Sequence, residues 1–199
     1  MKFNLLILNG LMAASLLASA CESIPTAPVE EYEATGLVYA NESWGFRIAR
    51  PDTNWGFSAQ IYYQDREANG LPRVELRMYA PRPQGESQFR PVLYLRPSAL
   101  SGDATLESLV SDIEEALEES FDGYDPGEKA TVQLATKPAM EWEFRLPSSS
   151  LRNFMLGDRF FVTAVQRGTH GYLFVGNGIS GTFPVEAYRQ IASSLTFTD

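Results

Sequence analysis

Several residue types that often form disulfides, bind metals or take part in catalysis are scarce in the sequence. Cys21 is the only cysteine and His170 the only histidine, so neither a disulfide framework nor a multi-histidine metal site can be built. No apolar run after residue 21 approaches the roughly 20 residues of a membrane-spanning helix. Asp and Glu outnumber Lys and Arg and give the chain a net charge of -9, which argues against a nucleic-acid partner. Hydrophobic residues still make up 44%, which predicts a globular core.

The N-terminus has the pattern of an export signal. One lysine precedes a broken apolar segment that ends in Ala18-Ser19-Ala20, and Cys21 follows directly. Small residues before a lone cysteine, about 20 residues from the N-terminus, resemble the lipobox of bacterial lipoproteins. Ala18 stands where that motif most often has leucine. The alternative is an ordinary Ala-x-Ala cleavage site followed by a stray thiol. We expect residues 1–20 to be a lipoprotein signal peptide and Cys21 to carry diacylglyceryl and palmitate chains, which together anchor a protein durably.

The resemblance to bacterial lipoproteins also implies a location. Glu22 follows the cysteine where an aspartate would favour retention in the inner membrane by the enterobacterial sorting rule. We therefore expect a lipid-anchored protein of the cell envelope, at the outer membrane and facing the periplasm. Residues 22–36 contain two prolines and four acids without periodicity, so 21–36 is predicted to be the lipidated cysteine and a flexible tether. Residues 37–199 remain for one domain.

Alternating apolar residues predict most of that domain to be antiparallel sheet. We expect two successive antiparallel strands at 44–49 and 55–63, strands at 73–80 and 92–95 with their arginines on an exposed face, strands at 131–135 and 140–146, and a hairpin of 160–166 with 172–175. Helical spacing predicts a helix over 103–121, capped by Asp103 or Thr105, and a closing helix over 184–194. The expected class is α+β, with helices covering an antiparallel sheet.

The entry and the end of the domain resemble one known superfamily. Tyr39, Gly45-Phe46, Ile48, Pro51 and Trp55 are similar to the opening of PsbP-like domains, and Ser194-Leu195-Thr196-Phe197 is similar to their closing strand. The superfamily includes DcrB-type bacterial lipoproteins. The resemblance implies an α/β/α sandwich around a central antiparallel sheet, and proteins that bind or stabilise other proteins without catalysis. It matches scaffold positions only, so no functional residue is carried over.

Three motifs have a simpler structural explanation than a catalytic one. The run Gly176-Asn177-Gly178-Ile179-Ser180-Gly181 spells Gly-x-Gly-x-x-Gly, but too little chain follows for the second strand and acid of a dinucleotide site. His170 lies in an expected hairpin tip, which is hard to desolvate. Ser148-Ser149-Ser150 lacks the Gly-x-Ser-x-Gly elbow. We therefore expect no catalytic residue, no cofactor and no enzyme, although a hydrolase of unfamiliar type stays a minor alternative.

Acidic residues are concentrated in one segment. Between Asp103 and Glu128 there are ten acids and no Lys or Arg, which exceeds the whole net charge. Like charges four residues apart cost a few tenths of a kcal/mol each, which the apolar face of the helix easily offsets. A solvated face explains the pattern; the functional alternative is docking of an envelope protein with a basic surface, or of divalent cations. The residues that would make this contact are Glu114, Glu115, Glu118, Glu119 and Asp122.

Two further hypotheses concern ligands. The segment 122–128 contains acids that could hold Ca²⁺, but it lacks the EF-hand spacing, so no metal site is expected. A pocket between helix and sheet, lined by the many aromatic residues, would instead suit a small-molecule or metal-ion-binding periplasmic module. The leading prediction remains a non-catalytic lipoprotein that serves as a protein-binding or assembly module.

Overall fold

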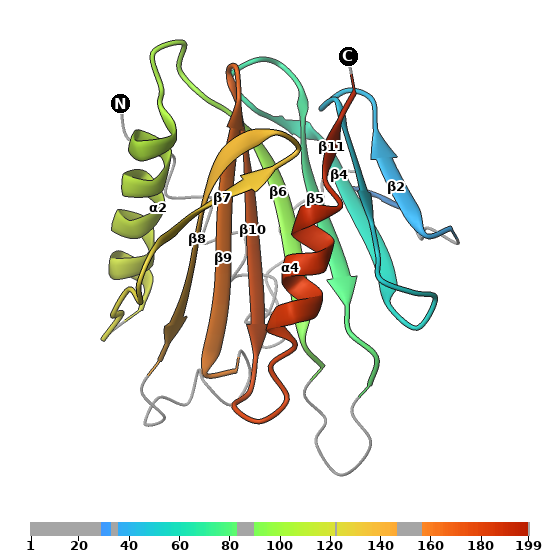
Figure 1. The fold of residues 1–199 in the computed structure, drawn as a ribbon. Helices are drawn as coiled ribbons and strands as arrows, with labels where there is room; N and C mark the ends of the chain where they lie inside the picture. Colours follow the sequence, from blue (N-terminus) through green and yellow to red (C-terminus); the bar gives the residue numbers. More distant parts are fainter. Residues whose placement is uncertain (1–28, 33–35, 83–89, 122, 147–156, 199) are drawn as a thin grey trace, which may run out of the picture.

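An eight-stranded antiparallel sheet forms the middle layer of the domain (Figure 1). The computed structural model describes residues 29–32, 36–82, 90–121, 123–146 and 157–198. The strands of the large sheet lie in the order β1-β4-β5-β6-β10-β9-β8-β7, and a small sheet has the order β11-β3-β2. The elements are β1 (Val29–Tyr32), β2 (Val38–Asn41), β3 (Phe46–Ala49), β4 (Gly56–Arg66), β5 (Pro72–Tyr79), β6 (Val92–Ala99), α2 (Leu106–Ser120), β7 (Ala130–Leu134), β8 (Lys137–Arg145), β9 (Arg159–Arg167), β10 (His170–Gly178), α4 (Val185–Ser193) and β11 (Thr196–Phe197).

Each face of the large sheet is covered by its own hydrophobic cluster. On β9, Val162 and Ala164 pack into the cluster of α2, while Phe161 and Val165 pack into the cluster that contains α4 and the small sheet. Period-two alternation produces this division because neighbouring side chains of a strand point to opposite faces. The sheet is therefore the middle of an α/β/α sandwich, which confirms the predicted fold class.

Helix α2 begins at a capping box. The Thr105 hydroxyl accepts a hydrogen bond from the Ser108 backbone N–H at 3.2 Å, and the Ser108 hydroxyl accepts one from the Thr105 N–H at 3.0 Å. Of the two caps that the sequence allowed, Thr105 is the one used. The helix buries one stripe, Leu109, Val110, Ile113, Ala116 and Leu117, against the sheet. Burial of each large apolar side chain contributes about 1.5 to 3 kcal/mol, so this stripe outweighs the repulsion of the acids.

The position of α4 depends on glycines in β10. A Cβ at Gly176 would lie 2.5 Å from the Tyr188 ring, and one at Gly178 would lie 2.6 Å from Phe183. The Tyr188 hydroxyl donates to the Asn177 carbonyl at 2.6 Å, so the ring lies directly on the strand. These glycines of the Gly-x-Gly-x-x-Gly run therefore belong to a strand that a helix packs against, in agreement with rejection of a dinucleotide site.

The two strands expected to pair after residue 44 lie in different sheets. Strand β3 pairs with β2 and β11, whereas β4 pairs with β1 and β5, so the predicted antiparallel pair is wrong. The Arg50 guanidinium donates to the Trp55 carbonyl and so holds the corner between the sheets. Strand β2 was not expected, because four residues give too short an alternation to detect.

Part of the expected tether is also a strand. Val29–Tyr32 forms β1 and pairs with β4 from Tyr62 to Ala59. Without β1, the edge of β4 would present unpaired backbone N–H and C=O groups. Pairing with these groups explains why this short segment forms a strand. The expectation of an unstructured segment throughout 22–36 is wrong at these four residues.

The polar face of β5 and β6 is much less exposed than the sequence predicts. Glu75 is 4% exposed and Arg96 is 5% exposed. Arg77 forms an ion pair with Glu75 at 2.6 Å, and Arg73 forms one with Asp65 at 2.5 Å. Buried charges need such partners. These arginines therefore lie in an ion-paired layer of the domain, and the expectation that they stand on an exposed face is wrong.

Candidate functional site

Cys21, the expected lipidation site, lies outside the described residues, as does the signal peptide. Among the helices of the described residues, none is long and apolar enough to cross a membrane. The anchoring of the chain therefore stays a prediction.

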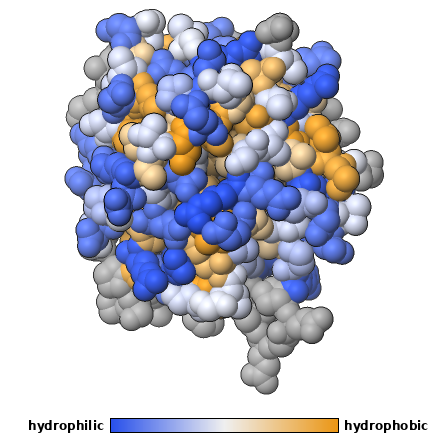
Figure 2. Space-filling view, viewed as in Figure 1, coloured by the Kyte–Doolittle hydropathy of each residue, from blue (hydrophilic) through white to orange (hydrophobic). Residues whose placement is uncertain are grey.

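The acidic face of α2 lies on the outer side of the sandwich. Glu115, Glu118 and Glu119 are exposed, and hydrophilic residues cover the left side of the molecule in Figure 2, where Figure 1 places α2. Glu114 is less exposed, because its carboxylate pairs with Lys129 Nζ at 2.7 Å. Asp122, the fifth residue predicted for partner binding, is outside the described residues. The structure thus brings three of the five predicted carboxylates together on one open face.

These carboxylates act on the groups around them. Burial, together with the charges of Glu114, Glu118 and Asp125, raises the pKa of Tyr124 to about 12, against a hydrogen bond from Trp142 that lowers it. Burial and the neighbouring Glu115 raise the pKa of Asp112. Burial is the largest cause of both shifts, and the neighbouring carboxylates add to it in the same direction. The exposed carboxylates of Glu115, Glu118 and Glu119 themselves give this face a negative potential.

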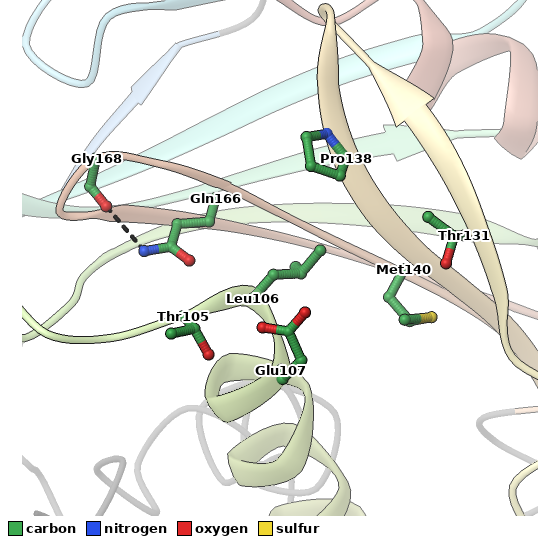
Figure 3. Close-up of a pocket in the computed structure, with 8 residues that line it drawn as sticks. All are labelled: Thr105, Leu106, Glu107, Thr131, Pro138, Met140, Gln166 and Gly168. Carbon is green, nitrogen blue, oxygen red and sulfur yellow. Dashed lines mark hydrogen bonds between the residues drawn. The ribbon is translucent and has the colours of Figure 1, made fainter.

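A cleft of about 410 Å³ opens where α2 begins (Figure 3). It lies between the first turn of the helix, strands β7 and β8, and the turn after β9. Its lining residues are Thr105, Leu106, Glu107, Thr131, Pro138, Met140, Gln166 and Gly168. None of them is aromatic, so the expected aromatic pocket is not this one. The Trp, Tyr and Phe side chains of the described residues are instead packed mostly in the two hydrophobic clusters.

The polar side chains of the cleft are Glu107, Gln166 and the hydroxyls of Thr105 and Thr131, which can donate or accept. Gln166 Nε2 donates to the Ala104 carbonyl at 2.7 Å and to the Gly168 carbonyl at 3.0 Å. Both amide hydrogens are thereby used, and Oε1 is left as the available group. In Figure 3 the Glu107 carboxylate lies close below the side chain of Leu106, on the helix side of the cleft. The cleft therefore combines one carboxylate, one amide oxygen and two hydroxyls with apolar walls.

The remaining candidate residues have structural roles. His170 is the first residue of β10 and its ring lies 5.2 Å from that of Trp44. The residue lies beside the turn of the β9–β10 hairpin, as predicted, and burial and the charge of Arg167 lower its pKa. Ser180 hydrogen-bonds the Asp158 carboxylate from both its backbone and its hydroxyl, which fixes the loop before α4. Ser148, Ser149 and Ser150 lie outside the described residues.

Metal ligands are not brought together in the described part of the chain. No three His, Cys, Asp or Glu side chains in it lie close enough to hold a metal ion. The segment 122–128 can be judged only in part, since Asp122 is not described.

The cleft was not foreseen from the sequence. Its walls come from segments near residues 105, 131, 138 and 166, and no local pattern links them. The capping signal at Thr105 was the one feature that pointed to this end of the helix.

Comparisons with known proteins bear on the fold. No model of a known protein family matches the chain, and no curated protein matches it in sequence. The solution structure of cyanobacterial PsbP (CyanoP) from Synechocystis sp. PCC 6803 is similar over 90% of this chain and 98% of that one, at 13% identity and a TM-score of 0.50. The crystal structure of LpqN, described as involved in cell envelope biogenesis of Mycobacterium tuberculosis, is similar over 86% and 92%, at 12% identity and a TM-score of 0.49.

At such identities a structural likeness shows the fold alone. The likeness to CyanoP extends over nearly the whole of both chains and agrees with the sandwich of one antiparallel sheet between two helical layers. The described residues therefore have a PsbP-like fold, as the resemblance in sequence implied.

Proposed function

We propose that this chain is a non-catalytic accessory protein of the cell envelope, held at a membrane by lipid on Cys21, that binds another protein through the acidic face of α2. The observation that carries the proposal is the one-sided charge of this helix. Its apolar stripe is buried in the core, while Glu115, Glu118 and Glu119 are exposed and, among the described residues, form no ion pair. The partner would present a basic surface.

The absence of an enzymatic role is supported by how the chemically versatile side chains are used. His170 packs against Trp44, and Asp158 is engaged by Ser180. General acid–base catalysis needs a titratable group positioned beside a place where a substrate can bind. The cleft at α2 contains one titratable residue, Glu107, and Gln166 beside it is already hydrogen-bonded to the backbone. This arrangement suits binding better than proton transfer.

A matched pair of variants tests the docking face. E115Q/E118Q/E119Q neutralises the exposed carboxylates of α2, and E42Q/D52N/E186Q removes three charges elsewhere on the surface. The Asp52 to Asn change retains the acceptor for the Asn54 N–H. Crosslinking in intact membranes followed by affinity capture should recover a specific partner with the wild type and the control variant. Recovery by the α2 variant at the same level would contradict the proposed face.

The second candidate function is the binding of a small ligand, for which the cleft provides a location. Its volume of about 410 Å³ lies at the lower end of the roughly 300 to 1,000 Å³ of ligand pockets. Melting-temperature shifts of the purified chain against a panel of metabolites and metal ions would identify such a ligand. A shift that survives E107Q would locate the ligand elsewhere.

A further inference from the structure

The one charged side chain among the residues that line the cleft at α2 is Glu107. Glu107 offers a carboxylate, and Gln166 offers Oε1 because its amide nitrogen is already bonded to the Ala104 and Gly168 carbonyls. A ligand group that only donates complements these acceptors, and ammonium and guanidinium ions are the side-chain groups that donate without accepting. Because this one charge is negative, the cleft is suited to a cation rather than to a carboxylate or phosphate.

The walls of the cleft select for an aliphatic stem. Leu106 lies on the helix side, and Pro138 and Met140 lie on the strand side (Figure 3). A thioether and a proline ring adapt to a flexible hydrocarbon chain. Lysine and arginine bury such stems along apolar surface and place their charged ends at a polar group. In this cleft the Glu107 carboxylate, beside Leu106, provides that group.

Electrostatics favour the same occupant. The first turn of a helix carries about half a positive charge, which stabilises Glu107 and weakly opposes a cation. The full charge of the carboxylate exceeds this opposition. The neighbouring acids of α2 add to the attraction, since the segment from Asp103 to Glu128 contains no Lys or Arg. Within the described residues, Glu107 forms no ion pair of its own, so its charge is available to a ligand.

We infer that the cleft binds a long basic side chain, lysine or arginine, presented by the partner that docks on the acidic face of α2. The inference rests on the proposed function and adds to it the point of attachment: one basic side chain inserts at the start of the helix, while other basic groups lie along Glu115, Glu118 and Glu119. An inserted side chain would fix the register of the partner, which a diffuse charge attraction alone does not.

Methyl NMR on the full lipidated chain in detergent micelles tests the cleft directly. With ¹³C-methyl-methionine labelling, Met140 reports from the wall of the cleft, and Met78, fully buried in the cluster with α4, reports on the fold. The probe is N-acetyl-lysine methylamide, and the matched neutral probe is the norleucine analogue of the same length. We expect a saturable shift of the Met140 signal with the lysine probe, a much smaller one with norleucine, and no change at Met78.

Two variants complete the test. Glu107→Gln should weaken binding of the lysine probe roughly fivefold, the upper end for an exposed ion pair, with an unchanged Met78 signal. E115Q/E118Q/E119Q should change it by less than twofold. Equal responses to lysine and norleucine, or undiminished binding in Glu107→Gln, would overturn the inference. If the lysine probe binds as expected but the triple variant still captures the partner, the docking face fails and the cleft stands.

Discussion

Tyr188 of α4 lies on Gly176 of β10 so closely that a Cβ on the glycine would come within 2.5 Å of the ring. Tyr188 is fully buried and contacts the rings of Trp55, Phe161 and Phe183. The missing side chain therefore determines how near the helix can approach the sheet. This pair is one of the contacts that hold the last helix on the central strands.

Gly176→Ala should lower the free energy of unfolding by about 1 to 3 kcal/mol, because the methyl group forces the Tyr188 ring and its helix outward. Urea denaturation followed by tryptophan fluorescence measures the change. Gly102→Ala is the matched control, since no heavy atom lies within 4 Å of a Cβ there. Equal stabilities for the two variants would contradict the packing described.

Thr105→Ala should destabilise the domain by about 1 kcal/mol, because the Ser108 N–H loses its acceptor at the start of α2. Ser111→Ala, on the exposed side of the same helix, should cost far less. Thermal melting by circular dichroism compares them. Since Thr105 also lines the cleft, a normal response to the lysine probe in the variant would separate stability from binding.

Arg189 connects α4 to β8 through charge. Its guanidinium contacts Glu141 at 2.7 Å, Glu143 at 2.9 Å and Glu186 at 2.7 Å. Arg189→Met should leave these carboxylates without their shared cation and cost about 1 kcal/mol at low salt, with a smaller deficit at 1 M salt because of screening. Arg47→Met, at an exposed position of β3, is the control. A deficit that does not depend on salt would show that the contribution of Arg189 is not electrostatic.

His170 should titrate below its ordinary pKa of 6.5, because burial and Arg167 disfavour the charged ring. The folded state then binds fewer protons than the unfolded state, so its contribution to stability is complete above pH 6.5 and is lost as the pH falls through the folded pKa. As the only histidine, it gives one imidazole signal in an NMR titration. His170→Gln should remove the corresponding step from the pH dependence of unfolding. A measured pKa at or above 6.5 would contradict the burial of the ring against Trp44.

Sequence periodicity predicted the elements with clear patterns. The stripe of Leu109, Ile113 and Leu117 predicted α2, and the turn at Gly168 predicted the hairpin of β9 and β10. It did not predict which sheet a strand joins, because alternation specifies a buried face but not a partner. For that reason the predicted pairing of β3 with β4 is wrong.

The candidate site was predictable only where its residues are close in sequence. The exposed carboxylates of α2 follow from helical spacing, and the structure places Glu115, Glu118 and Glu119 as expected. The cleft depends on where Gln166 and Met140 meet the first turn of the helix, which tertiary packing decides. The burial of Glu75 likewise depends on its partner Arg77 and on neighbouring strands. Neither relation has a signature within one segment.

The most direct test of the account is the intact mass of the mature protein extracted from membranes. We predict a chain that begins at Cys21 and carries a diacylglyceryl group with fatty acyl chains, and a Cys21→Ser variant that loses its membrane association. A mature chain with an unmodified Cys21 thiol, or one recovered without membranes, would contradict the proposal that this domain works as a tethered binding module.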